Sequence, residues 1–353
     1  MADTNKKAGC AVIGYGGMGG WHTRYLLNSD VGELRGIWDT NPAKRDLAKQ
    51  NGIHVYASEE DLLADPEISV VTICTPNDVH PELAIRALHA GKNVISEKPV
   101  ALSTLELERM IQASEETGKL FTVHQNRRWD CDFLMMREAY RSGRLGRVFQ
   151  IESRIQGSRG VPGDWRSRKP SGGMIFDWGV HLIDQMLQIV DDKKIVSVGC
   201  RCTHVTNHEV DDGFYLDILF EDDVCGHIEV GTHQFISLPR FFMCGTEGSA
   251  VINDWRDTCR CVINLDKTEY EVKPVVTAAG MTKTMAPRAE DTLETYEIPR
   301  PDSDVHDYYR NFIAATRGEA TQTVTHAQMR RVLKVMEAAF LSDEAKAVIP
   351  FKE

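Results

Sequence analysis

The stretch CAVIGYGGMGGW, residues 10–21, decides the fold of this 353-residue chain. A short apolar run ends at a glycine, and residues of helical character follow to about residue 29. Gly14, Gly16 and Gly19 have the spacing G-x-G-x-x-G: the first glycine permits a tight turn, the second lets the backbone approach a pyrophosphate, and the third allows close helix–strand packing. A glycine-rich turn without a ligand is the alternative, but the flanking strand and helix favour a dinucleotide-binding unit.

An acidic residue follows at the distance expected for binding an adenosine ribose. Asp39 ends the next predicted strand, 33–39, about 20 residues after Gly19. A carboxylate there accepts the ribose hydroxyls and repels a 2′-phosphate, so we expect NAD in preference to NADP. Lys44 and Arg45 lie on the next helix and could bind a 2′-phosphate, so NADP is the alternative cofactor. Helix capping is the alternative role for Asp39.

Strands and helices alternate throughout the first 125 residues. Apolar strands are predicted at 70–76, 93–97 and 120–125, with helices at 81–90 and 103–117 between them. This alternation predicts an α/β Rossmann domain with a doubly wound parallel sheet.

Ligands of such sheets bind beyond the carboxyl ends of the strands. Lys98, in SEKPV (96–100), points at that edge, whereas a solvated surface lysine is the alternative. In addition to the three glycines and Asp39, the residues expected to bind the cofactor are Gly17, Met18, Thr75, Pro76, Asn77, His80, Glu97 and Lys98.

The second half of the chain has a different pattern. Strand-like runs follow one another from 148 to 265, and several alternate apolar with polar residues, which predicts a large, mostly antiparallel open sheet with one covered face. Two helices, at about 304–317 and 325–342, close the chain. We expect a dinucleotide-binding domain at 1–125 and an α+β domain for substrate binding and oligomerisation at 126–353.

A free sheet face favours a partner subunit if apolar residues lie on it, so we expect a homodimer or homotetramer built through these sheets. The stretch PVVTAAGMTKTMAPRAEDT, 274–292, is small, polar and aperiodic, and it is predicted to be a long loop. We expect this loop at the subunit interface or over a neighbouring site.

The composition excludes several classes of protein. The net charge of −11 argues against a nucleic-acid or anionic-membrane partner, because both require a basic surface. No apolar run approaches the ~20 residues that span a bilayer, and the start, MADTNKKAGCAVIG, lacks the apolar core of a secretory signal. Nine cysteines without zinc or CxxC spacing indicate reduced thiols in a cytoplasmic protein, and no metal site is expected.

The stretch FDWGVHLID, 176–184, places two polar residues in an apolar helix. Asp177 and His181 are four residues apart, a spacing that puts both side chains on one helix face. A satisfied ion pair at a helix surface is one interpretation, and a proton-transfer pair is the other.

Three motifs occur together in this order: the glycine fingerprint, EKP (97–99) and SGGMIFDWGVH (171–181). Together they resemble the Gfo/Idh/MocA family, named for glucose–fructose oxidoreductase and inositol dehydrogenase, and the resemblance covers essentially the whole chain. It implies that Lys98, Asp177 and His181 form the catalytic set. Some members are NAD-dependent glycosidases, and one is a transcriptional regulator; the complete set argues against the regulator.

The resemblance implies hydride transfer between NAD and a ring secondary hydroxyl. The substrate is expected to be a cyclic polyol or sugar, either an inositol or a glycoside oxidised at the 3-position. His181 would act as general base, and Lys98 would orient the hydroxyl and stabilise alkoxide charge. Asp177 would hold the imidazole or contact the substrate. An NAD-dependent glycosidase and a non-enzymatic NAD-responsive binding protein are the alternatives.

Further residues are expected to line the substrate pocket. His124, Asn126 and Arg127 leave a strand at its carboxyl edge, in HQNRRWD (124–130), which resembles a segment of the family's sugar and inositol dehydrogenases. Trp165 and Arg166 lie on a loop before the catalytic helix, although a core or interface role is as plausible for the tryptophan. His22, just after the glycine loop, is interpreted as helix packing.

Overall fold

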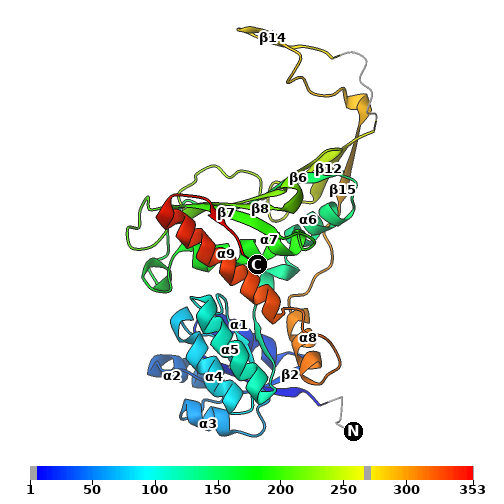
Figure 1. Cartoon of the computed structure of the whole chain (residues 1–353). Helices are drawn as coiled ribbons and strands as arrows, with labels where there is room; N and C mark the ends of the chain where they lie inside the picture. Colours follow the sequence, from blue (N-terminus) through cyan, green and yellow to red (C-terminus); the bar gives the residue numbers. More distant parts are fainter. Residues whose placement is uncertain (1–5, 266–271, 353) are drawn as a thin grey trace.

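The computed structural model describes residues 6–265 and 272–352, which build two large sheets with their helices, one above the other in Figure 1, and a small two-stranded hairpin. The first sheet is parallel, in the order β2-β1-β3-β4-β5, and it confirms the predicted doubly wound sheet. Its strands are β1 (Ala8–Ile13), β2 (Gly32–Trp38), β3 (Val70–Ile73), β4 (Asn93–Ser96) and β5 (Phe121–Val123).

Helices connect these strands. They are α1 (Gly17–Leu27), α2 (Pro42–Gln50), α3 (Glu59–Ala64), α4 (His80–His89) and α5 (Thr104–Thr117). Strands β3 and β4 end before the predicted residues 76 and 97. Thr75, Pro76 and Glu97 therefore lie in the connections beyond the carboxyl ends, where ligands of a parallel sheet bind.

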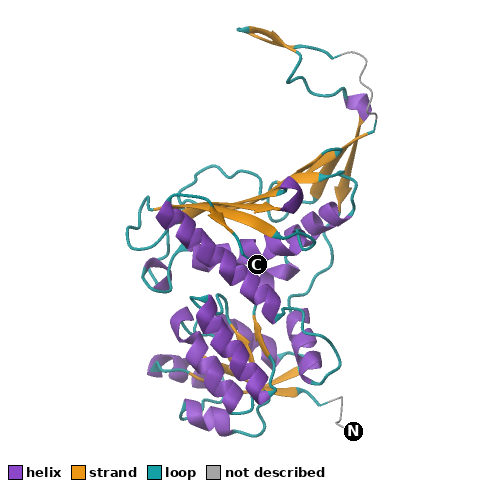
Figure 2. Ribbon diagram, viewed as in Figure 1, coloured by secondary structure: helices purple, strands orange, loops and turns teal. Residues whose placement is uncertain are grey.

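Within the described residues, the second sheet has nine strands in the order β15-β12-β11-β10-β6-β9-β8-β7-β16, and only β6 and β9 pair in parallel. Helices α6 (Cys131–Arg141), α7 (Val180–Ile189) and α9 (His326–Ala345) cover one of its faces (Figure 2). The strands are β6 (Val148–Gln156), β7 (Ile195–Thr203), β8 (Gly213–Phe220), β9 (Cys225–Gly231), β10 (Phe241–Gly245), β11 (Gly248–Ile252), β12 (Cys259–Asn264), β15 (Leu293–Ile298) and β16 (Ile349–Pro350).

The opposite face of this sheet is polar at its centre. Arg154 pairs with Glu229 at 3.2 Å and with Glu152, and His227 lies 2.7 Å from Asp217. The expected apolar surface for a partner is therefore not found at the centre of the sheet. The cause is the alternation of the strands, which sends their apolar residues to the helix-covered side and their polar residues outward.

The segment 274–292 is more regular than predicted. It contains a two-stranded hairpin, β13 (Val275–Thr277) and β14 (Gly280–Thr282), which projects away from the body of the molecule in Figure 1, and a short 3-10 turn, η6 (Glu290–Thr292). The prediction of an irregular loop is wrong for these residues. The turn between the strands ends at Gly280, whose φ of +121° favours glycine.

Helix α8 (Asp307–Thr316) returns to the Rossmann part, although it lies in the second half of the chain. The Tyr309 hydroxyl lies 2.7 Å from Nδ1 of His22 and 3.0 Å from the Thr72 hydroxyl. Arg310 pairs with Asp30 at 2.7 Å. The boundary at residue 125 stays a prediction, but α8 clearly belongs spatially to the dinucleotide domain.

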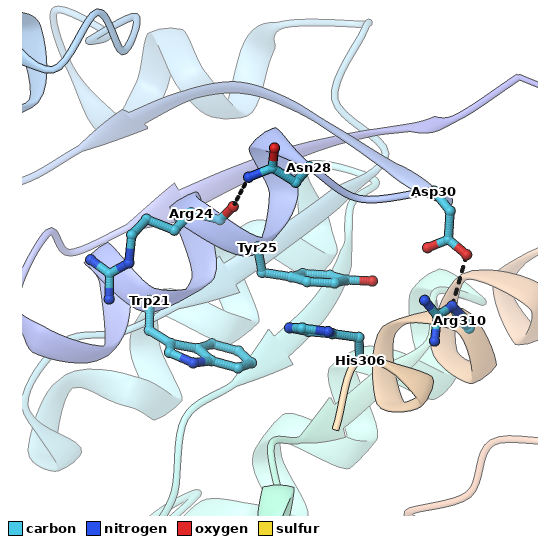
Figure 3. A pocket seen from close by; sticks show the side chains of 7 residues that line it. All are labelled: Trp21, Arg24, Tyr25, Asn28, Asp30, His306 and Arg310. Carbon is cyan, nitrogen blue, oxygen red and sulfur yellow. Dashed lines mark hydrogen bonds and ion pairs between the residues drawn. The ribbon is translucent and has the colours of Figure 1, made fainter. Parts of the chain in front are cut away.

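A hollow of about 380 Å³ lies where α8 meets α1 (Figure 3). The Tyr25 and His306 rings stack there with centroids 4.1 Å apart, and Trp21 lies beside His306. Lys98, Asp177 and His181 are not among the residues that line it. Among the described residues, no helix combines the length and apolar character needed to cross a membrane.

Candidate active site

The glycine loop between β1 and α1 has the geometry of a phosphate cradle. Gly14 has a φ of +93°, and a Cβ there would lie 2.5 Å from the Cys74 carbonyl oxygen. A Cβ at Gly19 would clash with the Gly14 carbonyl, whereas Gly16 has open space beside it. No side chain caps the first turn of α1, so its backbone N–H groups are available to a pyrophosphate. These observations fit a bound dinucleotide.

A hollow of about 500 Å³ opens beside this loop. Of the residues expected to bind the cofactor, Gly16, Gly17, Met18, Thr75, Pro76, Asn77, Glu97 and Lys98 line it. Trp165 and Arg166, expected at the substrate, line it as well. Cys74 and Asp164 also line the hollow, but they were not predicted. Asp164 could have been found because it directly precedes the predicted residues Trp165 and Arg166, whereas no such indication points to Cys74.

Asp39 lies outside this hollow, at the end of β2. Its two carboxylate oxygens accept hydrogen bonds from the backbone N–H groups of Tyr15, at 2.6 Å, and Asn41, at 2.7 Å. The acid is therefore fixed against the glycine loop, as expected for a ribose-binding residue. Arg45 donates to the Asp39 carbonyl at 2.7 Å, which keeps a cation close to the same place.

His80 was expected at the cofactor, but its side chain is fully buried. Its Nε2 lies 2.9 Å from the Thr75 carbonyl oxygen, and its Nδ1 lies 3.0 Å from that of Pro99. Burial lowers the pKa of His80. The imidazole thus links the loop after β3 to the turn after Lys98, and His80 is not among the residues that line the cofactor hollow.

Lys98, which lines the cofactor hollow, forms an ion pair with Asp177. Lys98 Nζ lies 3.0 Å from Asp177 Oδ1 and 2.8 Å from the Asp177 carbonyl oxygen. Arg166 Nε donates to Asp177 Oδ2 at 2.9 Å. Burial works to raise the pKa of Asp177, but Lys98 and Arg166 hold it below its usual range, so the carboxylate is ionised.

The expected contact between Asp177 and His181 is not formed, because the carboxylate of Asp177 is occupied by Lys98 and Arg166. Asp177 lies in a π-helical turn, η4 (Ile175–Gly179), and His181 lies in α7, which follows directly. The wider π turn breaks the simple i, i+4 stacking of an α-helix. Such turns are frequent at functional sites.

His181 is buried, and its Nδ1 has no hydrogen-bond partner. Burial, together with the charges of Lys98 and Arg127, lowers the pKa of His181 well below its usual value. The imidazole is therefore neutral near pH 7, which is the state that a general base requires.

Asp211 holds the first residues of the π turn by hydrogen bonds, a role that was not predicted from the sequence. Its Oδ2 accepts from the Ile175 N–H at 2.9 Å, and its backbone carbonyl accepts from the Met174 N–H at 3.2 Å. Gly173 has a φ of +105°, and a Cβ there would clash with the Asp211 carboxylate. Burial raises the pKa of Asp211 to about 6. The pair Asp211–Asp212 before β8 gave no pattern that pointed to this role.

Glu97 anchors a buried network beneath Lys98. Its Oε1 accepts from His22 Nε2 and His124 Nδ1, both at 2.8 Å, and its Oε2 accepts from the Lys98 N–H at 3.1 Å. Burial lowers the pKa of His22 to about 4. Burial also works to raise the pKa of Glu97, but the two imidazole donors hold it well below its usual range. Tyr309 completes the network at His22.

Two sequence interpretations change with this network. His22 is a hydrogen-bonding partner of Glu97 and is more than a packing residue, and His124, expected at the substrate, has no exposed side-chain surface. The ligand atoms of His22, Glu97 and His124 lie within 4.8 Å of one another, so these three residues form, in the part of the chain that the structure describes, a group that could hold a metal ion. The 2.8 Å distances between them are those of hydrogen bonds.

Unpartnered polar atoms gather in the segment after β5. The atoms His124 Nε2, Gln125 Oε1, Asn126 Oδ1 and Arg127 Nε are all buried without a hydrogen-bond partner, as is Nδ1 of His181. Buried polar atoms are almost always satisfied in native proteins, so such a cluster indicates a polar ligand or ordered water. The expected substrate residues Asn126 and Arg127 are in this cluster, together with His124.

Two family profiles match the chain. "Oxidoreductase family, NAD-binding Rossmann fold" matches residues 8–125, and "GFO/IDH/MocA C-terminal domain" matches residues 133–251. The chain belongs to the GFO/IDH/MocA family of NAD(P)-binding oxidoreductases, which confirms the resemblance seen in its motifs.

Among solved structures, an NAD-binding protein from Listeria innocua is similar to this chain, with 41% identity, a TM-score of 0.94, and coverage of 98% of this chain and 100% of that one. Among curated relatives, scyllo-inositol 2-dehydrogenase (NADP(+)) IolW of Bacillus subtilis (strain 168) is 27% identical over 96% of this chain and 94% of its own. The scyllo-inositol 2-dehydrogenase (NAD(+)) of the same organism is 26% identical over 75% of this chain and 79% of its own.

Proposed function

We propose that this protein is an NAD-dependent dehydrogenase that oxidises a ring secondary hydroxyl of a cyclic polyol or sugar. One observation carries the proposal: His181, whose buried Nδ1 has no partner, lies close enough to Lys98 and Arg127 for their charges to lower its pKa, and Lys98 lines the cofactor hollow, while Asn126 and Arg127 also have unpartnered buried polar atoms. A ligand rich in hydroxyl groups satisfies such atoms. Relatives named as scyllo-inositol 2-dehydrogenases support this substrate class.

The reaction removes two hydrogens from the secondary alcohol. Bound NAD⁺ supplies the acceptor for the hydride that leaves carbon, so the products are a ketone, NADH and a proton. His181, neutral because it is buried, takes the hydroxyl proton. Lys98 orients the hydroxyl and stabilises the developing alkoxide charge. Asp177 holds the Lys98 ammonium and the Arg166 guanidinium in place.

The preference for NAD over NADP is part of the proposal, and it rests on the fixed carboxylate of Asp39. The named relatives include one enzyme for each cofactor, and Arg45 keeps a cation close by. We further propose a cytoplasmic homodimer or homotetramer.

A substrate screen tests the proposed function. Inositols, aldoses and glycosides are offered with NAD⁺, NADH is followed by absorbance, and the products are analysed. Formation of NADH with an equal amount of ketone supports a dehydrogenase. Release of free sugar without net NADH would instead show a glycosidase with transient oxidation. Cofactor binding without turnover of any polyol or sugar would show an NAD-responsive binding protein.

A further inference from the structure

The face of α7 that carries His181 packs against the end of β5. Gln185, one helical turn after His181 and on the same face, donates to the Arg127 carbonyl oxygen at 2.8 Å. His124 is the first residue after β5 and lies three residues before Arg127. Burial is the main cause that lowers the pKa of His181, and a charge on His124 is close enough to contribute. His181 and His124 are therefore neighbours where α7 meets β5.

Each of these two imidazoles has one nitrogen that is closed off from solvent. Among the side-chain atoms of the described residues, His181 Nδ1 and His124 Nε2 both lack a hydrogen-bond partner. The two nitrogens are therefore not bonded to each other directly. Burying a polar atom without a partner is costly, and one ordered water satisfies several such atoms at once.

The hydrogen bond to Glu97 decides which nitrogen of His124 carries the hydrogen. Nδ1 of His124 lies 2.8 Å from Glu97 Oε1, and the ionised carboxylate can only accept, so Nδ1 is the donor. Nε2 of a neutral His124 is then an acceptor. His181 requires the opposite arrangement, because its buried Nδ1 leaves Nε2 to take the hydroxyl proton, and Nδ1 then carries the hydrogen. One nitrogen thus offers a hydrogen, and the other accepts one.

The charges around the two imidazoles differ. A positive charge on His181 is opposed by burial and by the charges of Lys98 and Arg127, which together lower its pKa. A positive charge on His124 instead faces the Glu97 carboxylate at 2.8 Å. A proton taken up during the reaction is therefore more stable on His124 than on His181.

We propose that His124 relieves His181 of its positive charge during the reaction, through one water that bridges His181 Nδ1 and His124 Nε2. The alcohol O–H bond breaks and its proton goes to His181 Nε2, while the hydride leaves carbon for NAD⁺. The Nδ1–H proton of His181 moves to the water, which passes one of its own protons to His124 Nε2. His181 stays neutral, and the charge rests on the His124–Glu97 pair. After the ketone leaves, the proton returns to His181 Nδ1 by the same path, and the Nε2 proton is lost to solvent.

The proposal rests on the proposed function and adds two positioning residues to it, because His124 and Glu97 act through His181. It also divides the unpartnered atoms of the segment after β5. Asn126 and Arg127 are left to bind hydroxyl groups of the substrate, whereas Nε2 of His124 serves the bridge.

His124→Asn tests the bridge, because the shorter amide can donate to Glu97 but has no atom in the place of Nε2. Hydride transfer is followed by NADH absorbance in stopped flow, in mixtures of H₂O and D₂O. The rate of the parent should fall along a curve as the D₂O fraction rises, because several protons move together. The rate of His124→Asn should be about tenfold lower or more and should fall along a straight line, as expected for one proton.

His326→Asn is the matched control, because it removes a partly buried imidazole whose Nε2 lies 3.1 Å from the Phe121 carbonyl oxygen at the start of β5. It should keep both the rate and the curve of the parent. A His124→Asn rate close to that of the parent, or a slower rate with the same curve, would overturn the proposal, as would a straight line for the parent. Glu97→Gln removes the facing charge and should also slow the step; an unchanged rate would overturn the role of Glu97.

A high-resolution crystal structure separates this proposal from the proposed function, because it needs no turnover. A water within about 3 Å of both His181 Nδ1 and His124 Nε2 supports the bridge, and nitrogens bound to separate groups would overturn it. If no polyol or sugar is oxidised, the proposed function fails, and the crystal structure still decides whether the bridge exists.

Discussion

His181 is the residue whose removal most directly tests the chemistry. His181→Ala should lower kcat by about 10²–10⁴-fold, as is typical for loss of a general base, while NAD⁺ still binds. Lys98→Met should also lower kcat, and the two losses should be non-additive because the groups act as one unit. Melting temperature, NAD⁺ affinity and kcat are measured on the same preparations. A folded, NAD-binding His181→Ala variant with turnover within a few-fold of the parent would contradict the assignment.

The pH dependence of alcohol oxidation follows from the burial of His181. A base must be unprotonated, so activity should fall as pH decreases through the pKa of His181. Burial places that pKa well below its ordinary value, so the acid limb of kcat/KM should lie below about pH 6.5, with no further gain from this group above it. The profile is measured with a substrate found in the screen. An acid limb centred above pH 7 would contradict a buried, neutral His181.

Asp39 should control the choice of cofactor. We expect higher kcat/KM with NAD than with NADP, because the carboxylate repels a 2′-phosphate. Asp39→Ala should narrow this difference mainly by raising the KM for NAD. Asp46→Ala, which removes an exposed carboxylate on α2, is the matched control and should keep the preference. Equal kcat/KM with NAD and NADP in the parent protein would contradict the proposed role of Asp39 in cofactor choice.

At the residue scale, the sequence predicted the side chains that belong to spaced motifs. The glycines and Lys98 were recognised because their spacing and their place after a strand carry the information. The role of His22 was not predicted, because its partners Glu97 and Tyr309 are brought to it by the fold from 75 and 287 residues away.

At the scale of elements, the π turn that carries Asp177 depends on glycine at position 173. Gly173→Ala forces an L side chain into a φ of +105° and against the Asp211 carboxylate. We expect a loss of stability of about 1–3 kcal/mol or more and a lower kcat. Gly163→Ala, where no atom lies within 4 Å of the added methyl, is the control. Unfolding in urea and kcat are measured; equal values for both variants would contradict the prediction.

The same turn shows the limit of periodicity as a predictor. The spacing of Asp177 and His181 predicted that both side chains lie on one face of a helix, which assumes 3.6 residues per turn. The structure inserts a π turn there, so the acid pairs with Lys98 and Arg166 from other elements. No pattern in FDWGVHLID distinguishes the two helix types. The strands of both sheets up to β12, by contrast, were predicted well, because their apolar patterns directly reflect burial, whereas the edge strands β15 and β16 were not predicted.

At the scale of the whole molecule, we expect a dimer or tetramer. The projecting hairpin, the residues directly after it and the segment after β9 carry exposed apolar side chains: Val276 is 73% exposed, Met281 71%, Met285 80% and Ile236 84%. Such residues favour burial against another subunit. Light scattering at micromolar concentration measures the mass, and a monomer would contradict the prediction. If the protein is oligomeric, deletion of 277–288 tests the hairpin: unchanged mass and unchanged KM would leave it without a role.

The return of α8 to the Rossmann part has a consequence for how the protein is made. The ribosome releases His22, Thr72 and Glu97 early, but Tyr309, which joins His22 and Thr72, is synthesised 287 residues after His22 and 237 residues after Thr72. Until α8 is synthesised, the hydrogen-bonded network of Glu97 and His22 beneath Lys98 therefore lacks Tyr309. We expect stalled chains that end at residue 300 to be cleaved by protease within the first domain, and full-length chains to resist. The network beneath Lys98 is then complete only after α8 has left the ribosome.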